Sequence, residues 1–261
     1  MPLNEKGAFF ADFFSGVGHV SRHARQMGFS AFAWDISNGE MYDLTNKKVL
    51  KSIARSVREG RVIAAMLAPP CTSFSVARDR TRVIRSRAQP WGVDMTGASQ
   101  NDQRALEIGN RTLRATLKIL RWLNQHKVPW LLENPHMSRM WWIPELRAAV
   151  RAAKGHYRLC DFCAYGTPWR KRTTVACGNL DEADTMAISR VCSGKHGYCS
   201  YTKQKHYQLT GSDKHGTPWT RVAQPYPAPL ARAFAKCLLQ PAFAAATYND
   251  IRAQGWTFRS R

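Results

Sequence analysis

Acidic residues are scarce in this chain, and long apolar runs are missing from it. Only 18 Asp and Glu stand against 39 Lys and Arg among 261 residues, so the formal net charge is +21. No stretch approaches the roughly 18 consecutive apolar residues that a membrane helix needs. The first residues also lack the charged-then-apolar pattern of a secretion signal. We therefore expect an intracellular protein, nuclear in a eukaryote and otherwise cytoplasmic.

The positive charge indicates a polyanionic partner, because a folded protein this basic repels itself. Nucleic acid is the first candidate. An acidic membrane surface is the second, and a surface charged only for solubility is the third. Hydrophobic residues make up 44% of the chain, enough for a large buried core. That content excludes a wholly disordered chain and a coiled coil.

Strand-like and helix-like segments alternate through the first half of the chain. Short apolar runs predict strands over residues 8–14, 30–35, 62–68 and 128–132, and 3.6-residue periodicity predicts helices over 19–27, 47–59 and 102–125. This alternation predicts an α/β fold with a doubly wound, mostly parallel sheet. In such sheets ligands bind at the carboxyl ends of the strands, where a glycine turn, Asp35, Cys71 and Glu133 are all expected.

The composition changes after about residue 155. Short extended runs over 157–165 and 173–177 precede a region rich in Cys, His, Gly and Lys, and a helical pattern returns over 227–243. We therefore predict a core over 1–177, a small Cys/His-rich insert over 178–225, and a C-terminal helix over 226–261 that returns to the core.

Two residues at expected strand ends have catalytic chemistry. Pro69 and Pro70 stiffen the turn before Cys71, and a nucleophilic thiol needs such fixed placement. A helix beginning after Thr72 would help to favour the thiolate. A carboxylic acid at Glu133 could protonate or hydrogen-bond a ring nitrogen of a heteroaromatic substrate. The alternatives are a buried thiol that caps a strand and a structural acid in a turn.

These segments together resemble the DNA cytosine-C5 methyltransferases. Residues 12–18 (Asp-Phe-Phe-Ser-Gly-Val-Gly) resemble the first motif of that family, and Pro70-Cys71 and Glu133-Asn134 match its two catalytic pairs. Residues 166–173 resemble its eighth motif, with Trp169 in place of the glutamine and Lys171 and Thr173 in place of the two arginines. The short form, with Glu-Asn-Pro and a Cys/His-rich insert, looks most like members carried by mobile elements.

The resemblance implies a Rossmann-like fold and S-adenosylmethionine-dependent methylation of cytosine C5 in DNA through a covalent cysteine adduct. It assigns Cys71, Glu133 and Arg172 to catalysis, with Lys171 as the alternative to Arg172. It also implies that the cofactor S-adenosyl-L-methionine is bound by Phe14, Ser15, Gly16, Gly18, Asp35, Asp43 and Pro70.

Two other functions remain open from the sequence. One branch with this motif set methylates RNA, and a nucleic-acid-binding module with an inactive site is the second alternative. The five arginines between residues 78 and 87 favour a loop that neutralises phosphates, against a merely solvated loop. No motif specifies a target sequence or an oligomeric state.

Seven cysteines, an odd number without a secretion signal, favour a nucleophile or a metal site over a disulfide framework. Cys192, Cys199 and His206 are evenly spaced, and Cys163 would complete a set of four zinc ligands. Cys160 and His196 are the competing ligands, and unpaired thiols in a basic loop are the alternative.

Overall fold

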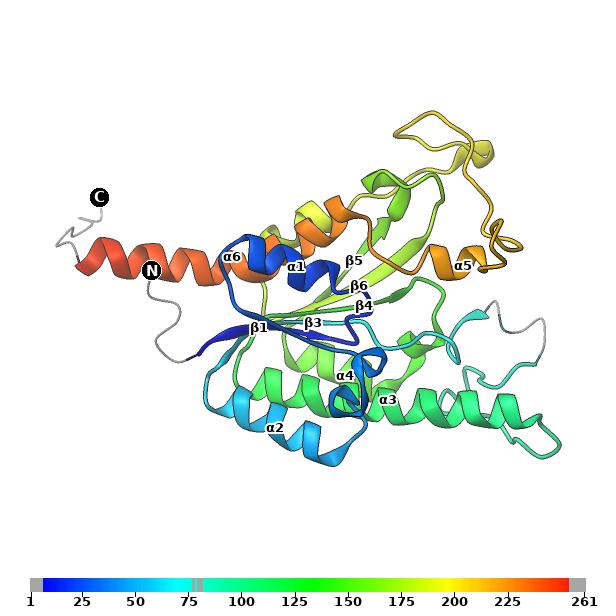
Figure 1. Ribbon diagram of the computed structural model, residues 1–261, viewed down its shortest axis with the longest axis horizontal. Helices are drawn as coiled ribbons and strands as arrows, with labels where there is room; N and C mark the ends of the chain where they lie inside the picture. The colour runs from blue at the N-terminus through cyan, green and yellow to red at the C-terminus, as the bar shows by residue number, and fades with distance from the viewer. Residues whose placement is uncertain (1–6, 77, 79–81, 254–261) are drawn as a thin grey trace.

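The structure, a computed structural model, describes residues 7–76, 78 and 82–253 (Figure 1). Its strands are β1 (Phe9–Phe13), β2 (Ala31–Trp34), β3 (Val62–Leu67), β4 (Trp130–Pro135), β5 (His156–Asp161) and β6 (Arg172–Gly178). Its α-helices are α1 (His19–Gln26), α2 (Lys47–Arg58), α3 (Gln100–Gln125), α4 (Pro144–Ala152), α5 (Trp219–Val222) and α6 (Ala228–Ala253). Short 3₁₀ turns, among them η1 (Ile36–Asn38) and η5 (Phe162–Tyr165), connect them.

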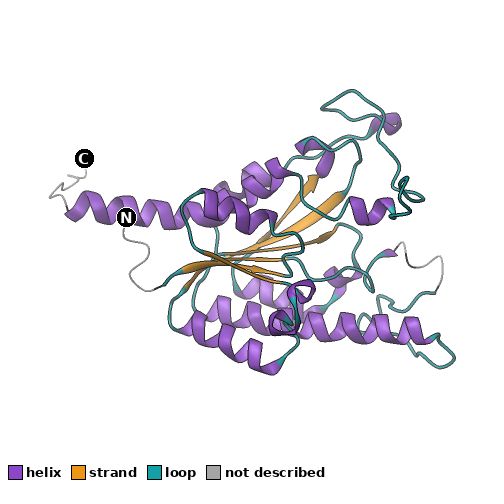
Figure 2. Cartoon of the chain, viewed as in Figure 1, coloured by secondary structure: helices purple, strands orange, loops and turns teal. Residues whose placement is uncertain are grey.

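The strands form one six-stranded sheet in the order β2-β1-β3-β4-β6-β5. The first four are parallel, whereas β6 runs antiparallel to both β4 and β5. The predicted α/β fold with a mostly parallel sheet is therefore confirmed. Helices cover both faces of the sheet, as expected for strands that are apolar on both sides (Figure 2).

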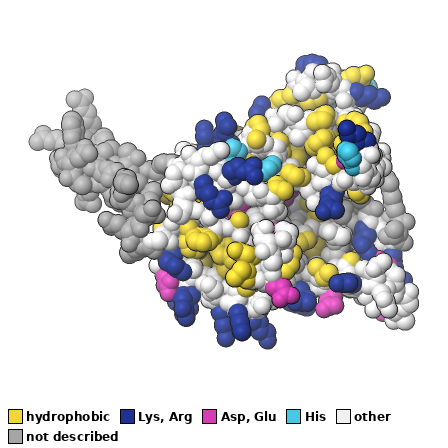
Figure 3. Space-filling model, in the orientation of Figure 1, with side chains coloured by type: hydrophobic (Ala, Val, Ile, Leu, Met, Phe, Trp, Pro, Cys, Tyr) yellow, Lys and Arg dark blue, Asp and Glu magenta, His cyan; other side chains and the backbone are white. Residues whose placement is uncertain are grey.

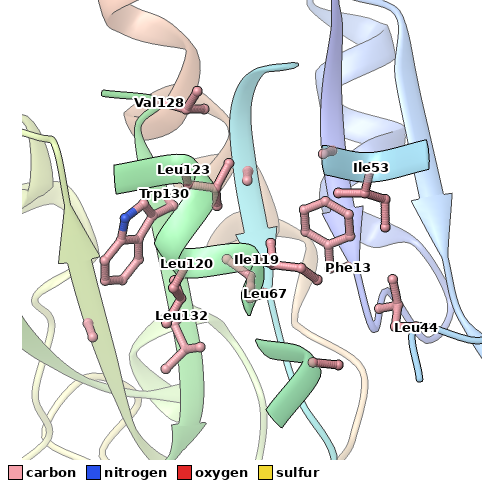
Figure 4. Close-up of a cluster of buried hydrophobic side chains, with 14 of the residues drawn as sticks. Phe13, Leu44, Ile53, Leu67, Ile119, Leu120, Leu123, Val128, Trp130 and Leu132 are labelled. Atoms are coloured by element: carbon pink, nitrogen blue, oxygen red, sulfur yellow. The ribbon is translucent and has the colours of Figure 1, made fainter. Parts of the chain in front are cut away.

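Two hydrophobic cores lie on opposite faces of this sheet. One packs the sheet against α2, α3 and α4, with Phe13, Leu67 and Trp130 fully buried in it (Figure 4). The other packs the sheet against α1 and α6, around Phe10 and Phe234. Successive residues of β1 alternate between these cores because strand side chains point to opposite faces.

The three helices that cover one face of the sheet, α2, α3 and α4, begin at residues suited to a helix start. The Asn46 side chain accepts a hydrogen bond from the Lys48 N–H (2.8 Å) before α2, and Ser99 accepts one from the Asp102 N–H (3.1 Å) before α3. Pro144 occupies the first turn of α4, where its missing N–H costs nothing. None of the described helices combines the length and apolar character that crossing a bilayer requires.

Two predicted strands differ in extent from those observed. The fourth strand runs through Glu133 and Asn134 to Pro135 because β6 pairs with it along that stretch, so Glu133 lies within the strand rather than after it. The extended run predicted over 157–165 stops at Asp161. The next four residues form η5, all of them buried, and Gly166 ends that turn with φ +97°.

Candidate active site

The parallel strands end at one edge of the sheet, opposite the last turns of α6 (Figure 1). The turn after β1, the residues after β2 and the segment after β3 all lie at this edge. The first two are in contact, because the Gly16 N–H donates to Asp35 Oδ2 (2.9 Å). These are the strand ends at which an α/β sheet binds ligands.

The turn after β1 has the shape of a cradle. Phe14, Gly16 and Gly18 all have positive φ angles (56°, 53° and 68°). A Cβ at Gly16 would meet nothing within 4 Å, so this stretch of backbone faces open space. The Ser15 hydroxyl is buried and has no hydrogen-bond partner among the described residues. The turn therefore offers a ligand open backbone and an unused hydroxyl.

Two carboxylates lie beside this cradle. Asp35 Oδ1 accepts the N–H and the hydroxyl of Ser37 (3.0 and 2.6 Å) and so caps η1. Asp43 accepts the N–H and hydroxyl of Thr45 (2.8 and 2.9 Å). Both side chains are half-buried and fixed in place, and a carboxylate has lone pairs for further donors.

Asp12 lies in β1 directly below the cradle. It is buried on the α1 side and accepts the Ser21 N–H (3.0 Å). Burial raises the pKa of this carboxyl from 3.8 to about 7, against the opposing effect of the Ser21 hydrogen bonds. The first turn of α1 is thus tied to β1 by an acid that is largely neutral below pH 7.

Cys71 follows the two prolines after β3 and is half-buried. Its carbonyl accepts the N–H groups of Phe74 and Ser75 (both 2.9 Å), and residues 72–74 form a turn, not the start of a helix that would favour the thiolate. Burial raises the pKa of the thiol above its ordinary 9.0, and the ammonium of Lys171 opposes this. The thiol is therefore protonated at neutral pH and must lose its proton to act as a nucleophile.

Glu133 lies buried in β4, with a hydroxyl on each carboxyl oxygen. The Thr173 hydroxyl bonds Glu133 Oε1 and also lies 2.9 Å from the Asn134 carbonyl oxygen, and the Tyr226 hydroxyl donates to Glu133 Oε2 (3.0 Å). A threonine hydroxyl has one proton. If Glu133 is protonated, it can donate to Thr173 while Thr173 donates to the Asn134 carbonyl.

Asn134 links the acid to the thiol segment. Its Nδ2 donates to the Pro69 carbonyl oxygen (2.8 Å), and its Oδ1 is buried without a hydrogen-bond partner among the described residues. The end of β4 is thus fixed against the turn that carries Cys71. The segment after β3 that carries Cys71 is therefore held against the end of the adjacent strand β4, which carries Glu133.

Arg172, predicted to be catalytic, begins β6 and pairs with an acid at the end of β5. Its guanidinium forms a bidentate pair with the buried Asp161 (3.0 and 2.8 Å). Its neighbour Thr173 instead contacts Glu133, because successive residues of β6 alternate between faces. Lys171 shares the Thr173 side, and its Nζ lies 4.5 Å from the centre of the Phe162 ring.

Sequence reasoning missed Thr173 and Tyr226 as partners of Glu133. Thr173 had a signal, since it occupies the place of the second arginine in the resembled eighth motif. Tyr226 is 93 residues from Glu133 in the chain and carries no pattern that could have revealed it.

The arginine-rich segment after Cys71 does not act as one surface. Arg85 is fully buried: its guanidinium donates to the Ser73 carbonyl and hydroxyl and to the Pro90 carbonyl (3.0, 2.9 and 2.8 Å) and stacks 3.9 Å from the Phe74 ring centre. The prediction of phosphate contact is therefore wrong for Arg85, which fixes the residues following Cys71. Arg78 pairs with Asp102, and Arg80 lies outside the described residues.

The predicted metal ligands come together beyond the carboxyl end of β5. The ligand atoms of Cys163, Cys192, Cys199 and His206 all lie within 4.8 Å of one another. The two competing residues lie apart from this group: Cys160 packs in the core beneath α6, and His196 is exposed.

Comparison with known proteins gives structural likeness without sequence likeness. No family model matches the chain, and no curated protein is detectably similar to it. Among solved structures it is similar to the S. pombe Dnmt2 methyltransferase, at 13% identity over 78% of this chain and 58% of that one (TM-score 0.41). A protein assigned as a DNA modification methyltransferase of an E. coli prophage matches at 16% identity over 70% of this chain and 51% of that one (TM-score 0.42).

The Entamoeba histolytica methyltransferase EhMeth matches at 11% identity over 94% of this chain and 98% of that one (TM-score 0.40). The chain spans 58% and 51% of the length of the first two neighbours. What this chain does is therefore inferred from its own side chains.

Proposed function

We propose that this protein transfers a methyl group from S-adenosylmethionine to C5 of a cytosine in DNA. The observation that carries the proposal is the pairing of Cys71 with Glu133, fixed by the Asn134–Pro69 hydrogen bond, beside the open glycine turn and Asp35. A thiol, a buried carboxyl and a cofactor cradle at one sheet edge are the groups this reaction requires.

The residues at the cradle fit the cofactor. Its ribose hydroxyls need acceptors, which Asp35 supplies, and its polar groups can bond the unused Ser15 hydroxyl and the open backbone at Gly16. Asp43 and Pro70 would complete the site towards the adenine and the target base. When bound, S-adenosylmethionine supplies an electrophilic methyl group.

The chain's own residues prepare the base. Cys71 Sγ forms a bond to C6 of the cytosine as the thiol proton passes to solvent, and N3 takes the proton of Glu133. Electron density then accumulates at C5, which is otherwise a poor nucleophile. After methylation, loss of the C5 proton to solvent restores the ring, breaks the S–C6 bond and lets N3 return its proton to Glu133.

The surroundings of Glu133 suit this proton transfer. As the proton moves to N3, negative charge develops on the carboxyl, and the Tyr226 O–H already points at Oε2. Burial raises the pKa of Tyr226 well above 10, so the phenol remains a donor. The Thr173 hydroxyl can turn its single proton towards the new carboxylate. Both donors would stabilise the transition state more than the ground state.

Arg172 would serve this site by positioning. It begins β6 and is held by Asp161, so it fixes the strand whose next residue is Thr173. Lys171 is the cation on the catalytic side, where it favours the Cys71 thiolate.

The charge of the chain suits a nucleic-acid substrate. Lys and Arg are spread over the face seen in Figure 3, with few Asp and Glu between them. Phosphate neutralisation supplies sequence-independent affinity for such a surface. A cytosine inside a duplex is out of reach of Cys71, so the base must be flipped out or lie in a single strand.

Transfer of tritiated methyl groups to DNA and RNA, assayed in parallel and followed by nucleoside analysis, tests the proposal. We expect 5-methylcytosine in DNA. DNA containing 5-fluorocytosine should form a denaturation-resistant adduct with the wild type, because fluorine at C5 blocks the final release.

Cys71→Ala should abolish both methyl transfer and adduct formation but retain cofactor binding. Cys237→Ala, which removes a buried thiol from α6, should retain all three. Methylation of RNA and not of DNA would show that RNA, and not DNA, is the substrate. Cofactor binding without transfer to either nucleic acid would leave a binding module in place of an enzyme.

A further inference from the structure

The segment between β6 and α6 has almost no core of its own. Of residues 191–210, the only buried ones are Cys192, Cys199 and His206, and the rest are exposed or half-buried. These three side chains face a fourth, Cys163, which belongs to η5 at the end of β5. A segment that buries so little apolar surface needs another source of stability.

The four donor atoms lie within 4.8 Å of one another, close enough to surround a single zinc ion. Cys192 Sγ lies 3.7 Å from His206 Nε2. Zinc–sulfur and zinc–nitrogen bonds of about 2.3 and 2.0–2.1 Å place tetrahedral ligands roughly 3.5–3.8 Å apart. Three thiols and one imidazole are the soft and intermediate donors that structural zinc prefers over oxygen-binding cations.

The backbone around the donors is already arranged as a support for them. Cys199 and His206 stand on the two arms of a small turn, where the Cys199 N–H donates to the Gln204 carbonyl and the His206 N–H donates to the Gly197 carbonyl (both 2.8 Å). The Ser200 N–H points at Cys192 Sγ (3.2 Å). An N–H directed at a ligating sulfur is a typical outer contact of a metal-bound thiolate.

We propose that Cys163, Cys192, Cys199 and His206 bind one zinc ion, which fastens residues 190–207 to the β5–β6 edge of the sheet. The same residue that ligates the ion also engages the strands. The Cys192 N–H donates to Asp161 Oδ2 (2.7 Å), and its carbonyl accepts from the Arg172 guanidinium (3.0 Å). By fixing Cys192, the zinc would also fix the Asp161–Arg172 ion pair that Cys192 contacts, and with it the start of β6 beside Thr173.

Metal content is the direct test, and it needs no methyl-transfer activity. The chain is purified without a histidine tag from zinc-containing medium. We expect about one zinc per chain. Cobalt put in its place should give the visible spectrum of a tetrahedral thiolate site. A chelator should raise amide hydrogen exchange within 190–207 by about tenfold or more while leaving β1 and β3 unchanged.

Matched variants separate the site from general thiol effects. Cys192→Ser should lose the zinc and the cobalt spectrum, while Cys237→Ser, at a buried thiol outside the cluster, should keep both. If Cys192→Ser does not fold, the chelator experiment on the wild type gives the same answer. Wild-type protein with less than about a tenth of an equivalent of zinc would overturn the proposal, whether its thiols are free or joined in a disulfide. Retention of zinc by Cys192→Ser would also overturn it.

Discussion

Replacing Tyr226 by Phe removes one of the two hydroxyls on Glu133 and leaves the ring in place. The ring packs edge-on against Phe162 and Phe234, with centroids 6.1 and 5.2 Å away, and Phe at 226 preserves both contacts. The change therefore isolates the hydrogen bond to Glu133 Oε2 (3.0 Å).

The size of the effect follows from the charge on the acceptor. A hydrogen bond to a charged group contributes about 1.5–3 kcal/mol, and each 1.36 kcal/mol is a factor of about ten in rate. Because the charge on Glu133 develops only as the proton moves to N3, the loss should lower kcat by roughly 10–150-fold and leave KM nearly unchanged.

Steady-state transfer of labelled methyl groups gives kcat and KM for the variant. Tyr165→Phe is the matched control, since the Tyr165 hydroxyl donates to the Ala187 carbonyl (3.2 Å) away from Glu133. We expect the control to behave as the wild type. A kcat for Tyr226→Phe within about threefold of the wild type, well below the loss expected for a charged hydrogen bond, would refute the role given to Tyr226.

Three further predictions follow from charges at and near the site. Alkylation of Cys71 should accelerate with pH and reach no plateau below pH 9, since burial raises the pKa of the thiol. Lys171→Met should slow alkylation further at any given pH, and equal rates would remove Lys171 from the site. Asp12 has a pKa of about 7 in the folded protein against an ordinary value of 3.8. Its neutral carboxyl therefore contributes its full stabilisation of the fold below pH 3.8, and about 4 kcal/mol of this stabilisation is lost as pH rises through 7. Asp12→Asn should therefore raise the melting temperature at about pH 8.5 and not at about pH 4; an equal shift at both values would contradict the buried, neutral acid. Arg85→Met leaves buried carbonyls unpaired and should cost about 3 kcal/mol of unfolding free energy in urea, whereas the exposed Arg87→Met should cost less than about 0.5 kcal/mol; equal losses would place Arg85 at the surface.

Local patterns predicted the parts of this molecule that depend on few residues. Helical periodicity predicted α2 and α3. The turn after β1 was predictable from Gly16 and Gly18, because glycine adopts positive φ angles more easily than other residues. The four residues proposed as zinc ligands were also predicted as a set, since Cys and His have little other reason to recur in a polar segment.

Contacts between distant segments were not predictable in this way. The position of Glu133 within β4 depends on pairing with β6, which no local pattern of β4 encodes. Arg85 was expected at the surface because arginine usually lies there, and the four acceptors around its guanidinium explain its burial. Arg172 pairs with Asp161 while its neighbour Thr173 contacts Glu133, and no local pattern of β6 shows which of the two faces the acid.

A segment whose buried positions are all proposed metal ligands has unusual freedom elsewhere. The exposed and half-buried residues of 191–210 contribute little packing, so most of them can change their charge, size or hydrogen-bonding groups without weakening the fold. This segment lies beside the edge of the sheet at which the proposed chemistry occurs. Its exposed residues can consequently be substituted, by natural variation or by protein engineering, without disturbing the proposed catalytic residues, provided that the four proposed ligands are kept.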